Sequence, residues 1–124
     1  MFSMSKNGII TLTRGDSALI PIFINAGDKT DPIRYELQDF DVLYFGVMEP
    51  NAPFQHSIIR KVLTKDDLNK KCDAVVKLGM NDTQYLQPGT YYYEVKLNKK
   101  TNGNLNDEGD VDTVVPRTKF ILFE

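Results

Sequence analysis

Short runs of alternating hydrophobic and polar residues recur along the chain, and stretches rich in Gly, Pro, Asn and Asp separate them. Alternation with a period of two is typical of strands whose side chains point in turn to a core and to solvent. The residues between the runs favour turns. The pattern therefore predicts seven strands, at 8–13, 17–25, 40–49, 57–63, 73–79, 90–97 and 111–124.

Helical periodicity is weak throughout, and the segments 64–69 and 81–86 are each expected to form at most a single helical turn. Two prolines fall inside predicted strands. Pro21 has no N–H to donate to a strand ladder, so we expect it at a sheet edge or a bulge. Pro116 predicts a break that divides the last strand into two pieces.

The segment from Asp82 to Leu97 contains the most specific fold signal. Pro88 and Gly89 favour a turn, because proline fixes its own φ and glycine tolerates positive φ. Tyr91 follows this turn at the start of a strand, which is the sequence form of a tyrosine corner. These signals predict a single domain over residues 1–124, an immunoglobulin-like antiparallel β-sandwich with Pro88, Gly89 and Tyr91 in structural roles. A small β-barrel is the alternative, because periodicity does not distinguish closed from stacked sheets.

Two predicted strands, 40–49 and the last one, carry large apolar residues on both faces, unlike strands with one solvated face. In an immunoglobulin-like sandwich they would flank the tyrosine-rich strand 90–97. The outer face of that sheet would then show Tyr44, Met48, Tyr92 and one apolar pair of the last strand, either Phe120 with Leu122 or Ile121 with Phe123. Such a patch indicates a protein contact. The alternative is that loops of the same chain cover it.

Composition narrows the class of protein. A chain of 124 residues, 41% hydrophobic and 26% charged, suits one globular domain. A formal net charge of -2 gives no field to attract nucleic acid or anionic membranes, and no apolar run reaches membrane-spanning length. One cysteine, Cys72, excludes an internal disulfide and fits a reducing compartment. Residues 1–7 lack the basic and apolar blocks of a secretory signal.

No group of residues meets the requirements of a catalytic site, so we expect no enzyme, no cofactor and no small-molecule substrate. His56 is the only histidine and Cys72 the only cysteine, and neither stands in a nucleophile or acid–base motif. The loop from Asn102 to Asp112 supplies many side-chain oxygens but lacks the ligand order of a calcium loop. A solvated hairpin is expected there, and ion binding stays open. Arg14-Gly15-Asp16 spells a tripeptide read by some adhesion receptors, but we expect a turn.

The order of several motifs resembles that of a known family. The motifs are Ile10-Thr11-Leu12-Thr13-Arg14-Gly15-Asp16-Ser17, the segment 42–50, Ile59-Arg60-Lys61, the segment 86–97, the segment 111–115 and Thr118-Lys119-Phe120-Ile121-Leu122. Together they resemble the immunoglobulin-like domain at the N-terminus of phage and prophage baseplate upper proteins and related small virion proteins. The resemblance covers nearly the whole chain, and the Thr-Arg-Gly-Asp opening with the Pro-Gly-x-Tyr strand is its most specific part.

The resemblance implies a structural component of a phage or prophage tail or baseplate, with no catalysis. The implied partners are other virion or baseplate proteins, or further copies of this chain, in a virion assembled in the host cytoplasm. In the family this domain usually leads into a longer stem, whereas this chain ends at Glu124, so a direct receptor-binding role is not expected. The alternative is a carbohydrate- or cell-surface-binding adhesion module that uses the loops 28–39 and 98–110, where Tyr35 is the one aromatic residue.

Overall fold

A computed structural model describes residues 1–24, 35, 37–67, 74–99 and 110–124. All seven predicted strands are present, the structure adds a short strand at the start of the chain, and the all-β class is confirmed. The two predicted helical turns correspond to η2 and α1. In chain order the elements are β1 (Phe2–Met4), β2 (Ile10–Thr13), β3 (Ala18–Ile22), β4 (Val42–Met48), the 3-10 turn η1 (Phe54–His56), β5 (Ile59–Leu63), the 3-10 turn η2 (Lys65–Asp67), β6 (Ala74–Leu78), α1 (Met80–Thr83), β7 (Gly89–Lys99) and β8 (Asp110–Phe123).

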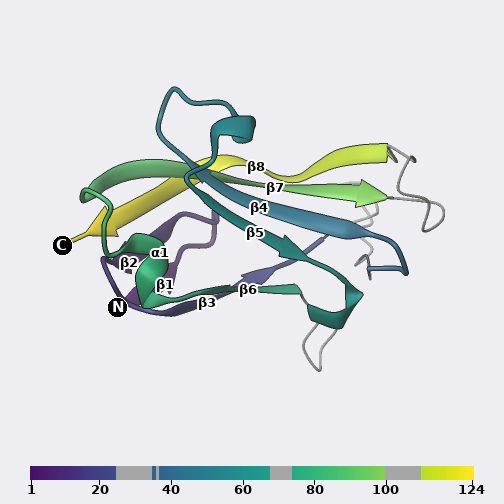
Figure 1. The fold of residues 1–124 in the computed structure, drawn as a ribbon, viewed down its shortest axis with the longest axis horizontal. Helices are drawn as coiled ribbons and strands as arrows, with labels where there is room; N and C mark the ends of the chain where they lie inside the picture. The colour runs from purple at the N-terminus through teal and green to yellow at the C-terminus, as the bar shows by residue number, and fades with distance from the viewer. Residues whose placement is uncertain (25–34, 36, 68–73, 100–109) are drawn as a thin grey trace.

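The strands form two sheets (Figure 1). Six strands lie in the order β1-β2-β8-β7-β4-β5, and β3 pairs with β6 in a separate two-stranded sheet. β2 and β8 run parallel, so the prediction of a purely antiparallel arrangement is wrong for this pair. Parallel neighbours need a crossover connection, and most of the chain lies between these two strands.

β7 lies between β4 and β8, as the sequence predicted for the tyrosine-rich strand. β8 runs unbroken through Pro116, so the predicted break is wrong. Instead, the register between β7 and β8 shifts on both sides of Val95, which pairs with Val115 next to Pro116. An irregularity of this kind is where a strand can contain a residue without an N–H to donate. Pro21 lies in β3, whose one partner among the described strands is β6, which confirms its predicted edge position.

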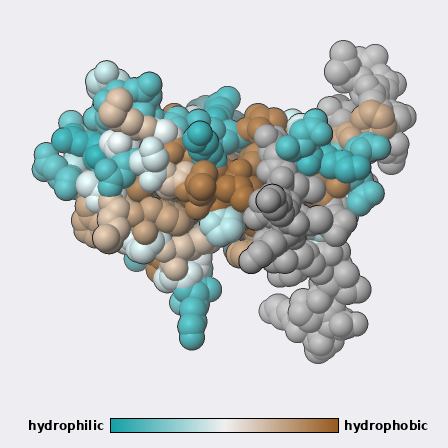
Figure 2. Space-filling model, turned by 90° about the horizontal axis from the view of Figure 1, so that it is seen from below, coloured by the Kyte–Doolittle hydropathy of each residue, from teal (hydrophilic) through white to brown (hydrophobic). Residues whose placement is uncertain are grey.

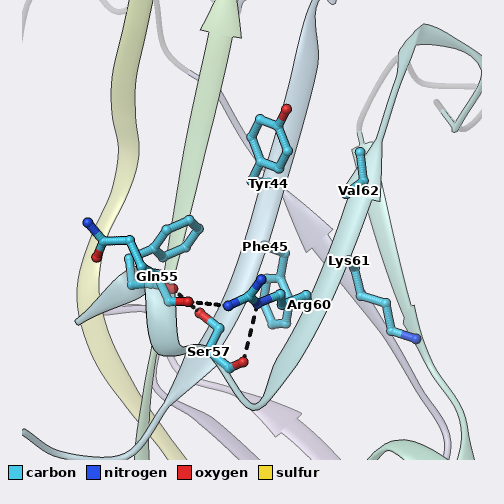
Figure 3. Close-up of a pocket in the computed structure, with 8 residues that line it drawn as sticks. Tyr44, Phe45, Gln55, Ser57, Arg60, Lys61 and Val62 are labelled. Carbon is cyan, nitrogen blue, oxygen red and sulfur yellow. Dashed lines mark hydrogen bonds between the residues drawn. The ribbon is translucent and has the colours of Figure 1, made fainter. Parts of the chain in front are cut away.

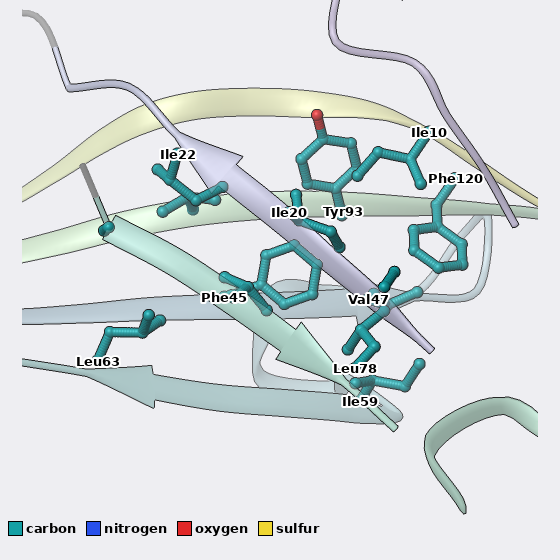
Figure 4. Close-up of a cluster of buried hydrophobic side chains, with 14 of the residues drawn as sticks. Ile10, Ile20, Ile22, Phe45, Val47, Ile59, Leu63, Leu78, Tyr93 and Phe120 are labelled. Atoms are coloured by element: carbon teal, nitrogen blue, oxygen red, sulfur yellow. The ribbon is translucent and has the colours of Figure 1, made fainter. Parts of the chain in front are cut away.

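The hydrophobic core collects the inward side chains of both sheets (Figure 4). Tyr93 of β7 is the largest side chain buried there, and its ring centre lies 5.7 Å from that of Phe45. The Tyr93 hydroxyl donates a hydrogen bond to the carbonyl oxygen of Gly8, which ties the start of the chain to the core. In β8, Phe120 and Leu122 belong to the core. Of the two apolar pairs considered for the outer face, Ile121 with Phe123 is therefore the outward one.

Candidate functional site

The corner predicted at Pro88, Gly89 and Tyr91 lies where the chain enters β7. Gly89 has a φ of 153°, which residues with a side chain rarely adopt. The Tyr91 hydroxyl donates a hydrogen bond of 2.6 Å to the carbonyl oxygen of Gln87. A bond from the ring back to the backbone just upstream is the contact that a tyrosine corner makes. Burial, with the charge of Glu49 adding to it, raises the pKa of the Tyr91 hydroxyl. The corner fixes the direction in which the chain enters β7.

The outward patch predicted from Tyr44, Met48 and Tyr92 is not open as a whole. Met48 pairs with Tyr92 across β4 and β7, so both point to the outer face of the six-stranded sheet. The Met48 side chain is nevertheless 0% exposed, and Tyr44 and Tyr92 are half-buried. The prediction that Met48 lies on an exposed interface is therefore wrong. A segment of the same chain covers this part of the sheet.

The covering segment consists of residues 49–57, which follow β4 and include η1 (Figure 1). Arg117 of β8 anchors it, because one terminal nitrogen of its guanidinium donates to three backbone carbonyl oxygens of the segment, those of Glu49, Pro50 and Ala52, at 2.7–3.1 Å. The same guanidinium lies 5.4 Å from the centre of the Tyr92 ring and 3.5 Å from a Glu94 carboxylate oxygen. Arg117 thus joins the segment to the outer face of β7.

Gly46 of β4 lets the covering segment lie close to the sheet. A Cβ at this position would stand 2.8 Å from the Phe54 ring and would also collide with the Ser57 hydroxyl. The Ser57 hydroxyl in turn donates to the Phe54 carbonyl oxygen at 2.5 Å. The absence of a side chain at Gly46 is therefore a condition for the position of η1.

A pocket of about 380 Å³ opens between the covering segment and strands β4 and β5 (Figure 3). Val62 of β5 is 60% exposed at its margin, and the Lys96 ammonium lies 5.2 Å from the centre of the Phe54 ring. A volume of this size with a mainly apolar wall is within the range of small-ligand and side-chain pockets. We call it the arch pocket. Its lining residues are Tyr44, Phe45, Phe54, Gln55, Ser57, Arg60, Lys61 and Val62.

Arg60 is the polar group that most distinguishes the arch pocket. Its Nε donates to the carbonyl oxygen of Ser57 at 3.3 Å, and a terminal nitrogen donates to that of Gln55. These bonds fix the guanidinium without neutralising it, and no acidic side chain in the described part of the chain forms an ion pair with Arg60. The pocket therefore combines aromatic walls with a guanidinium that has no ion-pair partner among the described acidic side chains.

The remaining candidates from the sequence are His56, Cys72 and the Asn102–Asp112 loop. His56 is exposed at the end of η1. Cys72 and residues 102–109 of the Asn102–Asp112 loop lie outside the described residues. Within the described ranges, no group of three or more His, Cys, Asp or Glu residues could hold a metal ion.

The Arg14-Gly15-Asp16 segment forms the predicted turn. The Asp16 N–H donates to the Thr13 carbonyl oxygen at 3.0 Å, and Gly15 takes a φ of 84°. Arg14 pairs with Glu124 at 3.2 Å, and Asp16 pairs with the amino terminus. Both charged side chains are thus engaged within the chain.

Tyr35, on which the adhesion alternative depends, is also engaged within the chain. Its hydroxyl donates to the carboxylate of Asp41, which is 4% exposed and also accepts the Gln38 N–H at 2.9 Å. The Lys99 ammonium lies 4.8 Å from the centre of the Tyr35 ring. The hydroxyl and one face of the Tyr35 ring therefore already have partners within the chain. Residues 28–34, 36 and 100–109 of the two loops lie outside the described residues.

The environment of Tyr35 predicts late ionisation. Burial first, then the hydrogen bond and the charge of Asp41, raise its pKa from 10.0 to about 12. Because the folded state holds the proton more tightly than the unfolded state, this contribution to stability is complete below pH 10 and is lost as pH rises through 12. We expect wild type and Tyr35→Phe to show the same tyrosinate absorbance up to about pH 11. Extra tyrosinate in the folded wild type below that pH would contradict the assignment.

β3 presents apolar side chains on both faces, and its outward side was missed as a site. Leu19 is 62% exposed and Phe23, just after the strand, is 49% exposed. Pro21 lies between them and pairs with Val75 of β6. Figure 2, seen from the side of β3 and β6, shows hydrophobic residues gathered across the middle of this face. We call these four residues the ribbon face. Leu19, Pro21 and Phe23 alternate visibly in the sequence, but the pattern does not say that Leu19 and Phe23 are partly exposed to solvent.

Comparisons with known protein families, with curated proteins and with solved structures find no match to this chain. None of the helices described is long and apolar enough to cross a membrane.

Proposed function

We propose that this chain is an immunoglobulin-like structural module of a phage or prophage tail or baseplate, which docks onto other virion proteins and catalyses no reaction. The order of the sequence motifs, from the Thr-Arg-Gly-Asp opening to the Pro-Gly-x-Tyr strand, is the ground for naming a virion. The surface chemistry is the ground for docking.

Three features support the immunoglobulin-like part of the proposal. Inward residues of two sheets share one core cluster, as in a sandwich. The penultimate strand begins with a tyrosine whose hydroxyl bonds to the upstream backbone. The same strand lies between β4 and β8, the two neighbours expected for it in an immunoglobulin-like sandwich.

The ribbon face carries the docking proposal. Most strands with one solvated face place polar residues outward, because exposed apolar area costs free energy in water. Leu19 and Phe23 instead stand outward on the same side, with Pro21 and Val75 between them. Contiguous apolar area of this kind usually marks a contact with another protein. Pro21 also interrupts the free edge of β3, which favours contact through the face over strand pairing at that edge.

The test is co-purification with the products of neighbouring genes that encode tail proteins. We expect the wild type to retain such a partner and the double variant Leu19→Ser/Phe23→Ser to bind it at least about tenfold more weakly, equivalent to about 1.4 kcal/mol. Tyr85→Ser is the matched control, because Tyr85 is exposed but lies outside the ribbon face. Neighbouring genes of another kind, or equal binding by the double variant, would contradict the proposal. Saturable binding to a glycan array would favour the adhesion alternative.

A further inference from the structure

We propose that the edge of β5 that has no partner among the described strands and the margin of the arch pocket together bind an extended segment of a partner protein, with an apolar side chain on Val62 and an acidic side chain on Arg60. This site lies on the six-stranded sheet, away from the ribbon face. The inference goes beyond the proposed function and holds for any partner protein, whether or not it belongs to a virion.

The edge of β5 offers a template for such a segment. β5 is the last strand of the six-stranded sheet, and its one partner among the described strands is β4. An edge strand presents backbone N–H and C=O groups that an added strand can pair with. β5 contains no proline over its five residues, whereas Pro21 interrupts the edge of β3. β5 also supplies three residues that line the arch pocket, Arg60, Lys61 and Val62.

The pocket lies on the same side of β5 as the fixed charge. Val62 pairs with Tyr44 and Arg60 pairs with Gly46, so these four residues share the outer face of the sheet. Lys61, on the opposite face, forms an ion pair of 3.0 Å with Asp82 and keeps its own partner. The outer face thus presents an apolar recess and a cation two residues apart along one strand.

This spacing specifies the partner. In a strand added beside β5, residues opposite Val62 and Arg60 would be two apart and would point to the same face. The residue near Val62 can place an apolar side chain against Val62, which is 60% exposed at the margin of the pocket. The residue near Arg60 is then best acidic, because a fixed guanidinium with unused N–H donors binds carboxylate strongly. The expected pattern is apolar-x-acid or acid-x-apolar, according to the strand direction.

The test is fluorescence polarisation with labelled peptides of about ten residues, the length of a long strand. One peptide contains Leu-Thr-Glu in a Thr/Val background, and the other contains Glu-Thr-Leu. We expect saturable binding of one order and at least tenfold weaker binding to Arg60→Glu. Changing the peptide Glu to Lys should restore binding to Arg60→Glu and weaken it on the wild type. This charge exchange also separates recognition from misfolding, because a misfolded variant would bind neither peptide.

Two further variants complete the test: one removes the apolar contact, and the other is a control for a charge change elsewhere on the surface. Val62→Ser should weaken the binding of the preferred peptide at least threefold. It should have little effect on the binding of a matched peptide with Ser in place of Leu. Lys119→Glu, which changes an exposed cation of β8, should bind like the wild type. The proposal fails if neither order binds, if Arg60→Glu binds the acidic peptide unchanged, or if the charge exchange restores nothing. Arg60-dependent self-association without peptide binding would also reject it, in favour of a second copy.

Discussion

Replacing Tyr93 by alanine is expected to lower the free energy of unfolding by about 3–5 kcal/mol. Tyr93 lies on the central strand β7, is fully buried and packs against Phe45 at a ring-centre distance of 5.7 Å. Its removal leaves a cavity where inward residues of both sheets meet, and close-packed surroundings relax only partly into such a cavity. Since domains of this size are stable by about 5–15 kcal/mol, the variant would lose a large share of its stability.

Tyr93→Phe separates packing from the hydrogen bond to Gly8. Phenylalanine keeps the ring but leaves the Gly8 carbonyl oxygen without the donor that it has in the wild type. The expected loss is about 0.5–1.5 kcal/mol. Urea unfolding followed by circular dichroism measures both variants, and the midpoint should fall without a large change in slope. Equal losses for the two variants would show that the hydroxyl, and not the ring, is the main contribution.

The strands of this fold could be predicted from the sequence because alternation with a period of two is a local property. Each predicted run overlaps an observed strand, although β1 was missed and β7 and β8 begin one residue earlier than predicted. The neighbours of β7 follow from placing its alternating tyrosines beside two strongly apolar strands. The parallel pairing of β2 with β8 could not be predicted in this way. It joins residues more than a hundred positions apart, and the alternation of either strand is the same in a parallel or an antiparallel pair.

The candidate site was predicted only in part, for a related reason. Alternation places Met48 on the outer face of β4, which is correct, but it does not reveal what lies on that face. Met48 is buried where the covering segment lies over the sheet, and Arg117 holds this segment in place. Arg117 is nearly seventy positions away in the sequence from the carbonyl groups that it binds, so a local pattern does not reveal the contact. The ribbon face shows the converse: Leu19 and Phe23 look like core positions, yet nothing in their local pattern shows that they stay exposed.

Gly46 gives the sharpest test of the covering segment, because one methyl group is enough to disturb it. Gly46→Ala is expected to cost about 1–3 kcal/mol, since its Cβ would stand 2.8 Å from the Phe54 ring and would also collide with Ser57. The matched control is Gly79→Ala. The nearest atom to a Cβ there, on Asp82, is 4.0 Å away, and the expected change is less than about 1 kcal/mol.

A second substitution shows whether the collision is the cause. In Gly46→Ala/Ser57→Gly the new methyl group meets no hydroxyl, so part of the lost stability should return, and the coupling of the two sites should exceed about 0.5 kcal/mol in a double-mutant cycle. Gly46→Ala should also displace the Phe54 wall of the arch pocket and weaken the peptide binding proposed above. If Gly46→Ala unfolds like Gly79→Ala and binds peptide like the wild type, η1 does not depend on close contact with β4. The burial of Met48 would then need a different explanation from the one given by the anchored segment.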